Sequence, residues 1–184
     1  MRLLAIALFS LTLSAQTFDH VSVHVAGGMS LKTWHGQATV QAFAVEAARA
    51  LRPRTELALV VTPMHITQPR SWFGDQFGDG DEDVRALSAA LLLRRTFRNE
   101  TLYVEGGTGP MWAERRVPAA TSRFNFHTQL GAGAVLWPRN RVSMIVGYRF
   151  GHISNGGYAP RNPGLNVSSI VIGTRIRTAT PRRR

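Results

Sequence analysis

The sequence predicts an all-β protein of about eight antiparallel strands in one domain. Its second half alternates between apolar residues and polar or small residues with a period of two, as expected for strands with two different faces. Short apolar stretches recur along the rest of the chain, and 17 glycines provide many points for turns. The length of 184 residues fits one domain, and a hydrophobic content of 44% is enough for a core.

The first 15 residues have the layout of a secretory signal peptide. Arg2 provides a positive start, the run Leu3–Leu13 is mainly apolar, and Ala15 is a small residue at the cleavage point. A buried first strand is the other reading of this run. We therefore predict a signal peptide over residues 1–15, followed by one β domain over residues 16–184.

The first five strands after this segment are predicted from less regular patterns. Residues 39–50 and 84–93 are rich in alanine and could form helices by intrinsic propensity. We predict strands there because the neighbouring segments are strands and the gaps are turn-sized. Residues 68–83 contain glycines and several acidic residues, which predict a long loop. The five predicted strands are Val21–Ala26, Thr39–Ala50, Thr55–Ile66, Val84–Arg98 and Thr101–Gly109.

The last three predicted strands alternate most clearly between an apolar face and a polar or small face. The first of them carries Thr128 on its apolar face. Ile145 and Val171 are the exceptions in the other two, because each lies on the polar or small face. The three strands cover residues 124–136, 141–150 and 165–177.

Two architectures fit these strands. One is a soluble barrel or sandwich with its apolar face inward, and the other is an eight-stranded outer-membrane barrel that is apolar outside and polar within. The polar faces hold many small residues, which suits the narrow lumen of an eight-stranded barrel. After the signal peptide, no stretch reaches the ~18 apolar residues of a membrane-spanning helix. The absence of cysteine excludes disulfide scaffolds and thiolate metal sites.

The charge of the chain favours phosphate-rich partners. The net charge is +11, and all but one of the 22 Lys and Arg residues are arginine. Arginine presents a planar fork that binds phosphate or carboxylate through two hydrogen bonds. Two partners fit this composition: nucleic acid bound by a soluble domain, and the phosphorylated headgroup of a bacterial lipid bound by a membrane barrel.

One segment near the end of the chain carries residues suited to ester hydrolysis. His152 and Ser154 are two positions apart, so a continuous strand projects both from one face, with backbones about 7 Å apart. An imidazole that takes the proton of a serine hydroxyl produces a nucleophile. The backbone N–H groups of Asn155, Gly156 and Gly157 follow and could hold a developing oxyanion. An ordinary polar strand end and glycine turn has the same pattern.

The strand face that carries His152 and Ser154 indicates the kind of substrate that they could reach. His152 and Ser154 continue the apolar face of Tyr148 and Phe150. In a membrane barrel that face contacts lipid. A catalytic pair there would meet an acyl chain without extracting the lipid from the membrane.

Several motifs in the second half of the chain belong together. They are Tyr148-Arg149-Phe150, His152-x-Ser154-Asn155-x-Gly157 and Asn162-Pro163-Gly164-x-Asn166, with further segments at Tyr103–Pro110, Arg123–Phe126 and Gln129-x-Gly131-x-Gly133. These motifs resemble the lipid A 3-O-deacylases, the PagL-type acyloxyacyl hydrolases. The resemblance covers roughly residues 101–177 closely and the earlier part of the chain weakly.

The resemblance implies an eight-stranded antiparallel β-barrel in the bacterial outer membrane that removes an ester-linked 3-hydroxyacyl chain from lipid A. By motif position, Ser154 would be the nucleophile and His152 the general base. The backbone N–H groups of Asn155 and Gly157 resemble the oxyanion donors, and Asn162 resembles a residue that supports the site. The implied partner is lipopolysaccharide, with no cofactor, no metal and no nucleic acid.

The third member of the catalytic triad departs from the family pattern. The family has a glutamate where this chain has Asn166. An asparagine oxygen can accept the imidazole N–H and hold the tautomer, but it cannot offset the charge of an imidazolium. In a serine triad the change from carboxylate to amide can cost about 10⁴ in turnover. Glu105 could stand in as the acid, although its alternation places it with Tyr103 on a lumen face.

Two other functions fit parts of the sequence. One is a non-catalytic structural or lipid-binding outer-membrane barrel of the same shape. The other is a soluble basic β domain that binds nucleic acid, whose affinity would fall steeply with salt. Solubility without detergent would separate these two.

Overall fold

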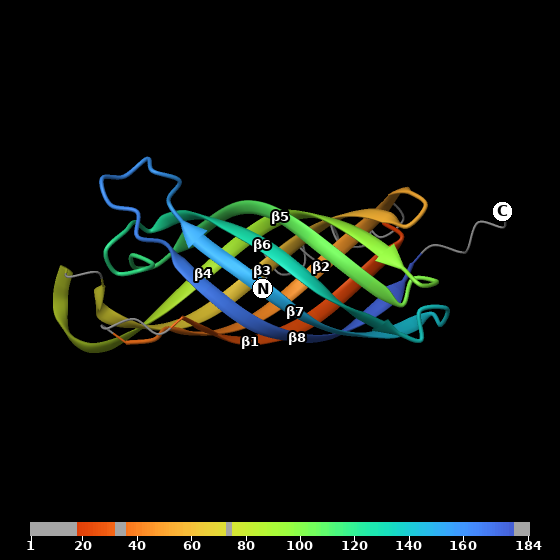
Figure 1. The fold of residues 1–184 in the computed structure, drawn as a ribbon, viewed down its shortest axis with the longest axis horizontal. Helices are drawn as coiled ribbons and strands as arrows, with labels where there is room; N and C mark the ends of the chain where they lie inside the picture. The colour runs from red at the N-terminus through yellow and green to blue at the C-terminus, as the bar shows by residue number, and fades with distance from the viewer. Residues whose placement is uncertain (1–17, 32–35, 73–74, 179–184) are drawn as a thin grey trace, which may run out of the picture.

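The computed structural model describes residues 18–31, 36–72 and 75–178, which form a closed barrel of antiparallel strands (Figure 1). Each strand pairs with the next one in the chain, and β1 pairs with β8 to close the sheet. The predicted eight-stranded antiparallel barrel is therefore confirmed. The strands are β1 (His20–Ser30), β2 (Thr39–Arg52), β3 (Thr55–Trp72), β4 (Asp75–Phe97), β5 (Leu102–Ala113), β6 (Phe124–Leu136), β7 (Val142–Ser154) and β8 (Leu165–Arg177).

One prediction concerns residues that the structure does not describe. The predicted signal peptide, residues 1–15, lies outside the described residues. Within the described part, no helix is long and apolar enough to cross a membrane.

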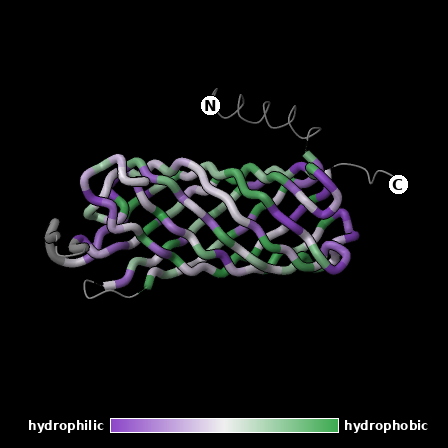
Figure 2. The backbone as a smooth tube through the Cα atoms, turned by 45° about the horizontal axis from the view of Figure 1, so that its top comes forward, coloured by the Kyte–Doolittle hydropathy of each residue, from purple (hydrophilic) through white to green (hydrophobic). Residues whose placement is uncertain are grey.

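The exterior of the barrel is apolar. Hydrophobic and hydrophilic residues alternate along the strands (Figure 2), and the large apolar side chains point outward. Leu130, Val142 and Ile170 are each more than half exposed, whereas Asn125 and Gln129 are buried inside the barrel. A soluble barrel or sandwich would turn the apolar face inward, so this arrangement excludes that architecture and fits an exterior that contacts lipid.

Several strands are longer than the sequence predicts, among them β1, which reaches Ser30, and β5, which reaches Ala113. The predicted loop over residues 68–83 is wrong, because β3 and β4 stay paired up to Trp72 and Asp75. Backbone hydrogen bonds extend a two-stranded ribbon whatever its side chains are, so loss of apolar alternation does not mark its end. The alanine-rich segments are strands, as predicted. β7 extends past its predicted end, Phe150, to Ser154.

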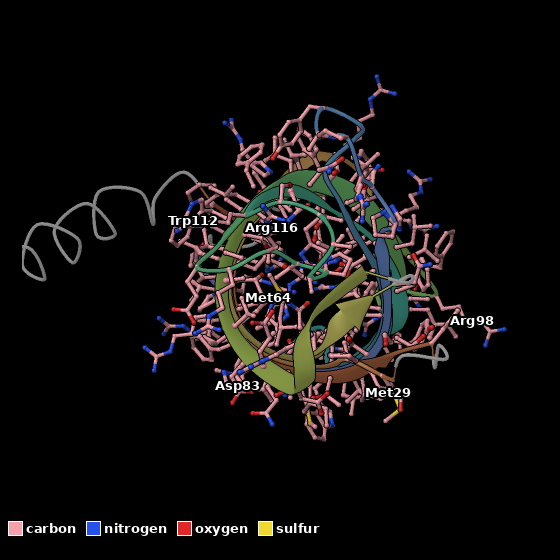
Figure 3. All side chains as sticks on the ribbon, turned by 90° about the vertical axis from the view of Figure 1, so that its left-hand side faces the viewer. Met29, Met64, Asp83, Arg98, Trp112 and Arg116 are labelled. Atoms are coloured by element: carbon pink, nitrogen blue, oxygen red, sulfur yellow. The ribbon has the colours of Figure 1, made fainter. Side chains whose placement is uncertain are left out.

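A network of buried charges lies inside the barrel. The end-on view in Figure 3 shows side chains projecting into the lumen. Arg94 donates hydrogen bonds to both oxygens of Glu46, at 2.6 and 2.7 Å. It also donates two to Glu105 Oε2, at 3.0 and 2.8 Å. Arg149 donates two to the other oxygen of Glu105, at 3.0 and 2.6 Å. Buried charges persist in proteins when they are paired in this way.

The rest of the lumen contains apolar clusters as well as polar groups, so the interior is less uniformly polar than the alternation predicts. Met111 and Ile153 belong to a cluster near the long loops. Val135 and Ile145 belong to one near the β6–β7 turn. Both exceptions to the alternation, Ile145 and Val171, are buried inside the barrel. Apolar packing at these levels limits the number of buried polar groups that need partners.

Candidate active site

His152 and Ser154 lie on the outside of the barrel at the end of β7. The burial pattern of β7 alternates, with Arg149, Gly151 and Ile153 buried inward and the residues between them half-buried or exposed. Because β7 continues unbroken to Ser154, the two side chains share the exterior face that their spacing predicts. They lie at the end of the barrel that carries the long loops (Figure 1).

Asn166 contacts His152 directly from the neighbouring strand. The two residues are register partners in the β7–β8 pair. His152 Nδ1 lies 2.6 Å from Asn166 Oδ1. An amide oxygen can only accept, so Nδ1 carries the hydrogen in this contact and Nε2 has a free lone pair. Asn166 is therefore close enough to hold the imidazole of His152 in the predicted orientation.

The imidazole and the hydroxyl are neighbours on one face, but they are not hydrogen-bonded to each other in this structure. Among the described residues, neither His152 Nε2 nor Ser154 Oγ has a hydrogen-bond partner. Contacts between nucleophile and base are often loose in a site without substrate and tighten when substrate binds. Proton transfer therefore requires a rotation that brings Ser154 Oγ to Nε2.

Asn155 organises the loop that follows Ser154. It is fully buried, and its side-chain N–H donates to the backbone oxygen of Arg161 at 2.7 Å. Its backbone N–H donates to Asn162 Oδ1 at 2.9 Å, and its side-chain oxygen accepts from Gly157 N–H at 2.8 Å. Asn162 therefore contacts the residue that follows Ser154, a position from which it can support the site as the resemblance implies.

The same bonds occupy both predicted oxyanion donors. The backbone N–H groups of Asn155 and Gly157 each donate to a side-chain oxygen of the loop. Between them, the N–H of Gly156 has no acceptor among the residues that the structure describes. To hold an oxyanion, Asn155 and Gly157 must exchange these internal acceptors for the substrate.

Gly164 packs against the imidazole, a contact that the sequence analysis did not predict. Its φ is +68°, a conformation that residues with a Cβ rarely adopt. A Cβ built there would lie 2.8 Å from His152 Cε1. The only advance signal was the Asn-Pro-Gly sequence ahead of Asn166, which indicates a sharp turn but not the residue that the turn contacts.

Aromatic side chains flank Ser154 on the side away from Asn166. Phe126 on β6 is the register partner of Ser154. Its ring meets that of Phe124 edge to face at 5.7 Å, and Phe124 meets Tyr158 at 6.1 Å. The Tyr158 hydroxyl donates to the backbone oxygen of Phe124 at 2.5 Å and so ties the loop to β6. Ser154 therefore lies between an apolar wall and a polar pair.

Glu105 is excluded as a substitute for the triad acid. Its carboxylate is buried in the lumen, where Arg94 and Arg149 bind its two oxygens. His152 lies on the opposite side of the sheet, so the wall of the barrel separates the two groups. The lumen position indicated by the alternation is correct.

The family model for lipid A 3-O-deacylase (PagL) matches residues 19–175 of this chain. The chain belongs to the lipid A 3-O-deacylase family. A curated relative, the lipid A deacylase PagL of Bordetella bronchiseptica, is 33% identical over 86 residues. That match covers 44% of each chain, so this chain spans less than half of the relative it matches.

Solved structures show the same barrel at low sequence identity. The outer membrane enzyme PagL is 20% identical, with a TM-score of 0.53 over 85% of this chain and 98% of that one. Neisserial surface protein A is 13% identical, with a TM-score of 0.63 over 86% and 96%. Ail, the attachment invasion locus protein of Yersinia pestis, is 12% identical, with a TM-score of 0.53 over 86% and 96%.

Membership of this family and the apolar exterior agree on the location of the chain. It is an outer-membrane β-barrel, which excludes the soluble nucleic-acid-binding domain considered from composition. Two tryptophans lie near opposite ends of the barrel wall, Trp112 at the end of β5 and Trp137 after β6, and both are exposed. Indole rings commonly lie at the two membrane interfaces.

Proposed function

We propose that this member of the lipid A 3-O-deacylase family is a serine esterase that removes an ester-linked 3-hydroxyacyl chain from lipid A. The observation that carries the proposal is the exterior cluster of Ser154, His152 and Asn166, with His152 Nδ1 held 2.6 Å from an amide oxygen. The cluster lies on the surface that faces lipid, at the end of the barrel with the long loops. An acyl ester in the membrane reaches such a cluster from the side.

The reaction follows from the tautomer of His152. Nε2 takes the proton of Ser154 as Oγ attacks the ester carbonyl carbon, which forms a tetrahedral intermediate. The intermediate collapses, the bond to the sugar oxygen breaks, and His152 returns the proton to that oxygen. Water, deprotonated by His152, then cleaves the acyl-serine ester and releases the free fatty acid.

Asn166 sets the orientation of the imidazole during these steps. Its oxygen holds Nδ1–H, so Nε2 stays directed away from β8. It carries no charge, so the imidazolium in the transition state is stabilised less than by a carboxylate. We therefore expect slow turnover from this protein.

The loop 155–164 supplies the oxyanion donors in this proposal. The N–H groups of Asn155 and Gly157 turn to the developing oxyanion as their bonds to Asn162 and to the Asn155 side chain open. Because both donors must first leave their internal acceptors, we expect them to stabilise the transition state less than donors that are already free and positioned. Before substrate binds, Asn162 holds the loop through the bond that its side-chain oxygen accepts from the Asn155 N–H.

The first experiment measures fatty-acid release from purified lipopolysaccharide by mass spectrometry of lipid A. Ser154→Ala and His152→Ala should each abolish the release of a 3-hydroxyacyl chain, while the barrel still folds. Ser168→Ala is the matched control, because Ser168 also lies outside the barrel, with its hydroxyl 2.8 Å from that of Tyr148. It should retain activity. Release that persists in both site variants contradicts the site, and no release by the unmodified protein favours a non-catalytic lipid-binding barrel.

A further inference from the structure

A row of polar side chains runs obliquely across the exterior of the barrel from Asn166 and His152. Asn166, His152, Thr128 and Thr108 are successive register partners on β8, β7, β6 and β5. All four point outward. The row ends at β4, where the partner of Thr108 is the exposed Leu91. The catalytic pair of His152 and Asn166 thus continues into two threonines that the proposed reaction does not use.

The two threonine hydroxyls bond to each other and have hydrogen-bonding capacity left over. Thr108 Oγ1 lies 2.9 Å from Thr128 Oγ1. One hydroxyl donates in this contact, which leaves the hydrogen of the other without an acceptor among the described residues. On a surface that faces hydrocarbon, water does not supply that acceptor. The pair is therefore able to bind one polar group of a lipid.

The path of an acyl chain from Ser154 leads over this pair. The strands slant across the barrel, so a line from the end of β7 parallel to the long axis crosses β6 and then β5 (Figure 1). A lipid chain in a bilayer runs along that axis, toward the middle of the membrane. Thr128 is a diagonal neighbour of Ser154 across the β6–β7 pair, at a typical spacing of roughly 7–8 Å.

We propose that Thr108 and Thr128 form a subsite for the hydroxyl group on the acyl chain that is removed. This inference rests on the proposed function. A 3-hydroxyl is two carbons beyond the ester carbonyl, so it lies just below Ser154 when the carbonyl is at Oγ. There it accepts the unused threonine hydrogen and donates to a threonine lone pair. Phe126 and Leu130, before and after Thr128 on the same exterior face, contact the methylene groups on either side.

The subsite predicts a preference among substrates that differ by one oxygen atom. An unsubstituted chain has no group that accepts the unused threonine hydrogen, so the subsite adds nothing to its binding. A neutral hydrogen bond is commonly worth a factor of about three to ten in binding. We expect release of the hydroxylated chain to be faster than that of the unsubstituted chain by about this factor.

The test compares two synthetic lipid A analogues in detergent micelles. They carry either a 3-hydroxytetradecanoyl or a tetradecanoyl chain on the ester that is cleaved. The full-length protein, Thr128→Val and Thr108→Val are assayed for kcat/KM on both, since valine keeps the shape of threonine without its hydroxyl. Thr128→Ser restores the hydroxyl, and Thr174→Val removes another exterior threonine, at the far end of β8.

The ratio of the two rates decides the assignment. Support requires that the ratio falls toward one in the valine variants and stays high in Thr128→Ser and Thr174→Val. A ratio that is unchanged in both valine variants overturns the subsite, as does an equal loss on both substrates, which is the result of a purely structural threonine pair. Release of neither chain by the unmodified protein overturns the proposed function itself, and the subsite with it.

Discussion

The two halves of the barrel wall present different surfaces to the membrane. The exterior of β1–β4 carries a belt of apolar side chains, with Val25, Phe43, Val61 and Leu91 exposed. The exterior of β5–β8 carries the polar row of Thr108, Thr128, His152 and Asn166 among its apolar residues. A lipid-facing barrel needs only the first kind of surface, because polar groups there lack water. This difference is the one expected if the second half carries the proposed site.

The carboxylate of Glu105 inside the barrel gives a second contrast with this row. In the lumen, Arg94 and Arg149 saturate the carboxylate of Glu105. On the exterior, Ser154 and the Thr108–Thr128 pair retain unused hydrogen-bonding capacity. Satisfied polar groups stabilise a fold, whereas unsatisfied ones at a surface are available to a ligand.

The largest expected change in activity comes from placing a carboxylate beside His152. Asn166→Glu adds a carboxylate opposite His152 and should raise kcat for fatty-acid release, with an upper bound of about 10⁴ set by the reverse change in a serine triad. Thr174→Glu, an acid elsewhere on the exterior of β8, should leave kcat unchanged. No gain in Asn166→Glu, or an equal gain in both variants, contradicts the proposed triad geometry.

A change in the lumen should lower the stability of the barrel more than a change on its exterior. Arg94→Met leaves Glu46 and Glu105 short of partners, and the free energy of unfolding should fall by about 3–5 kcal/mol. Leu91→Ala, on the apolar exterior, should cost less because lipid fills the space. Urea unfolding in lipid vesicles measures both. Equal losses would mean that interior and exterior contribute alike.

The smallest change among these tests concerns the glycine that packs on the catalytic imidazole. Gly164→Ala displaces His152, and such a displacement can cost up to about 10² in kcat. Gly80→Ala is the matched control, because Gly80 also has positive φ, +76°, and its Cβ would meet nothing within 4 Å. Both variants should lose similar thermal stability. If both also lose similar activity, backbone strain rather than contact with His152 explains the effect.

The sequence predicted the strands and faces of the site well because they depend on local periodicity. Alternation placed His152 and Ser154 outside, and it placed Glu105 inside, before any contact was known. It failed at residues 68–83, where strand pairing continues although the apolar alternation stops. The family resemblance assigned the N–H groups of Asn155 and Gly157 as oxyanion donors, and the loop conformation, which the sequence does not give, pairs each of them with a side-chain oxygen.

The chain by itself determined the strands, their two faces and the pair of residues suited to hydrolysis. The two faces follow from a period of two, which also fits a soluble barrel; the family resemblance favoured the membrane barrel. Only the tertiary structure decided which residues meet across strands: Asn166 with His152, Gly164 with the imidazole, and Thr108 with Thr128. Register and loop conformation set those contacts, and both depend on the closure of the whole sheet.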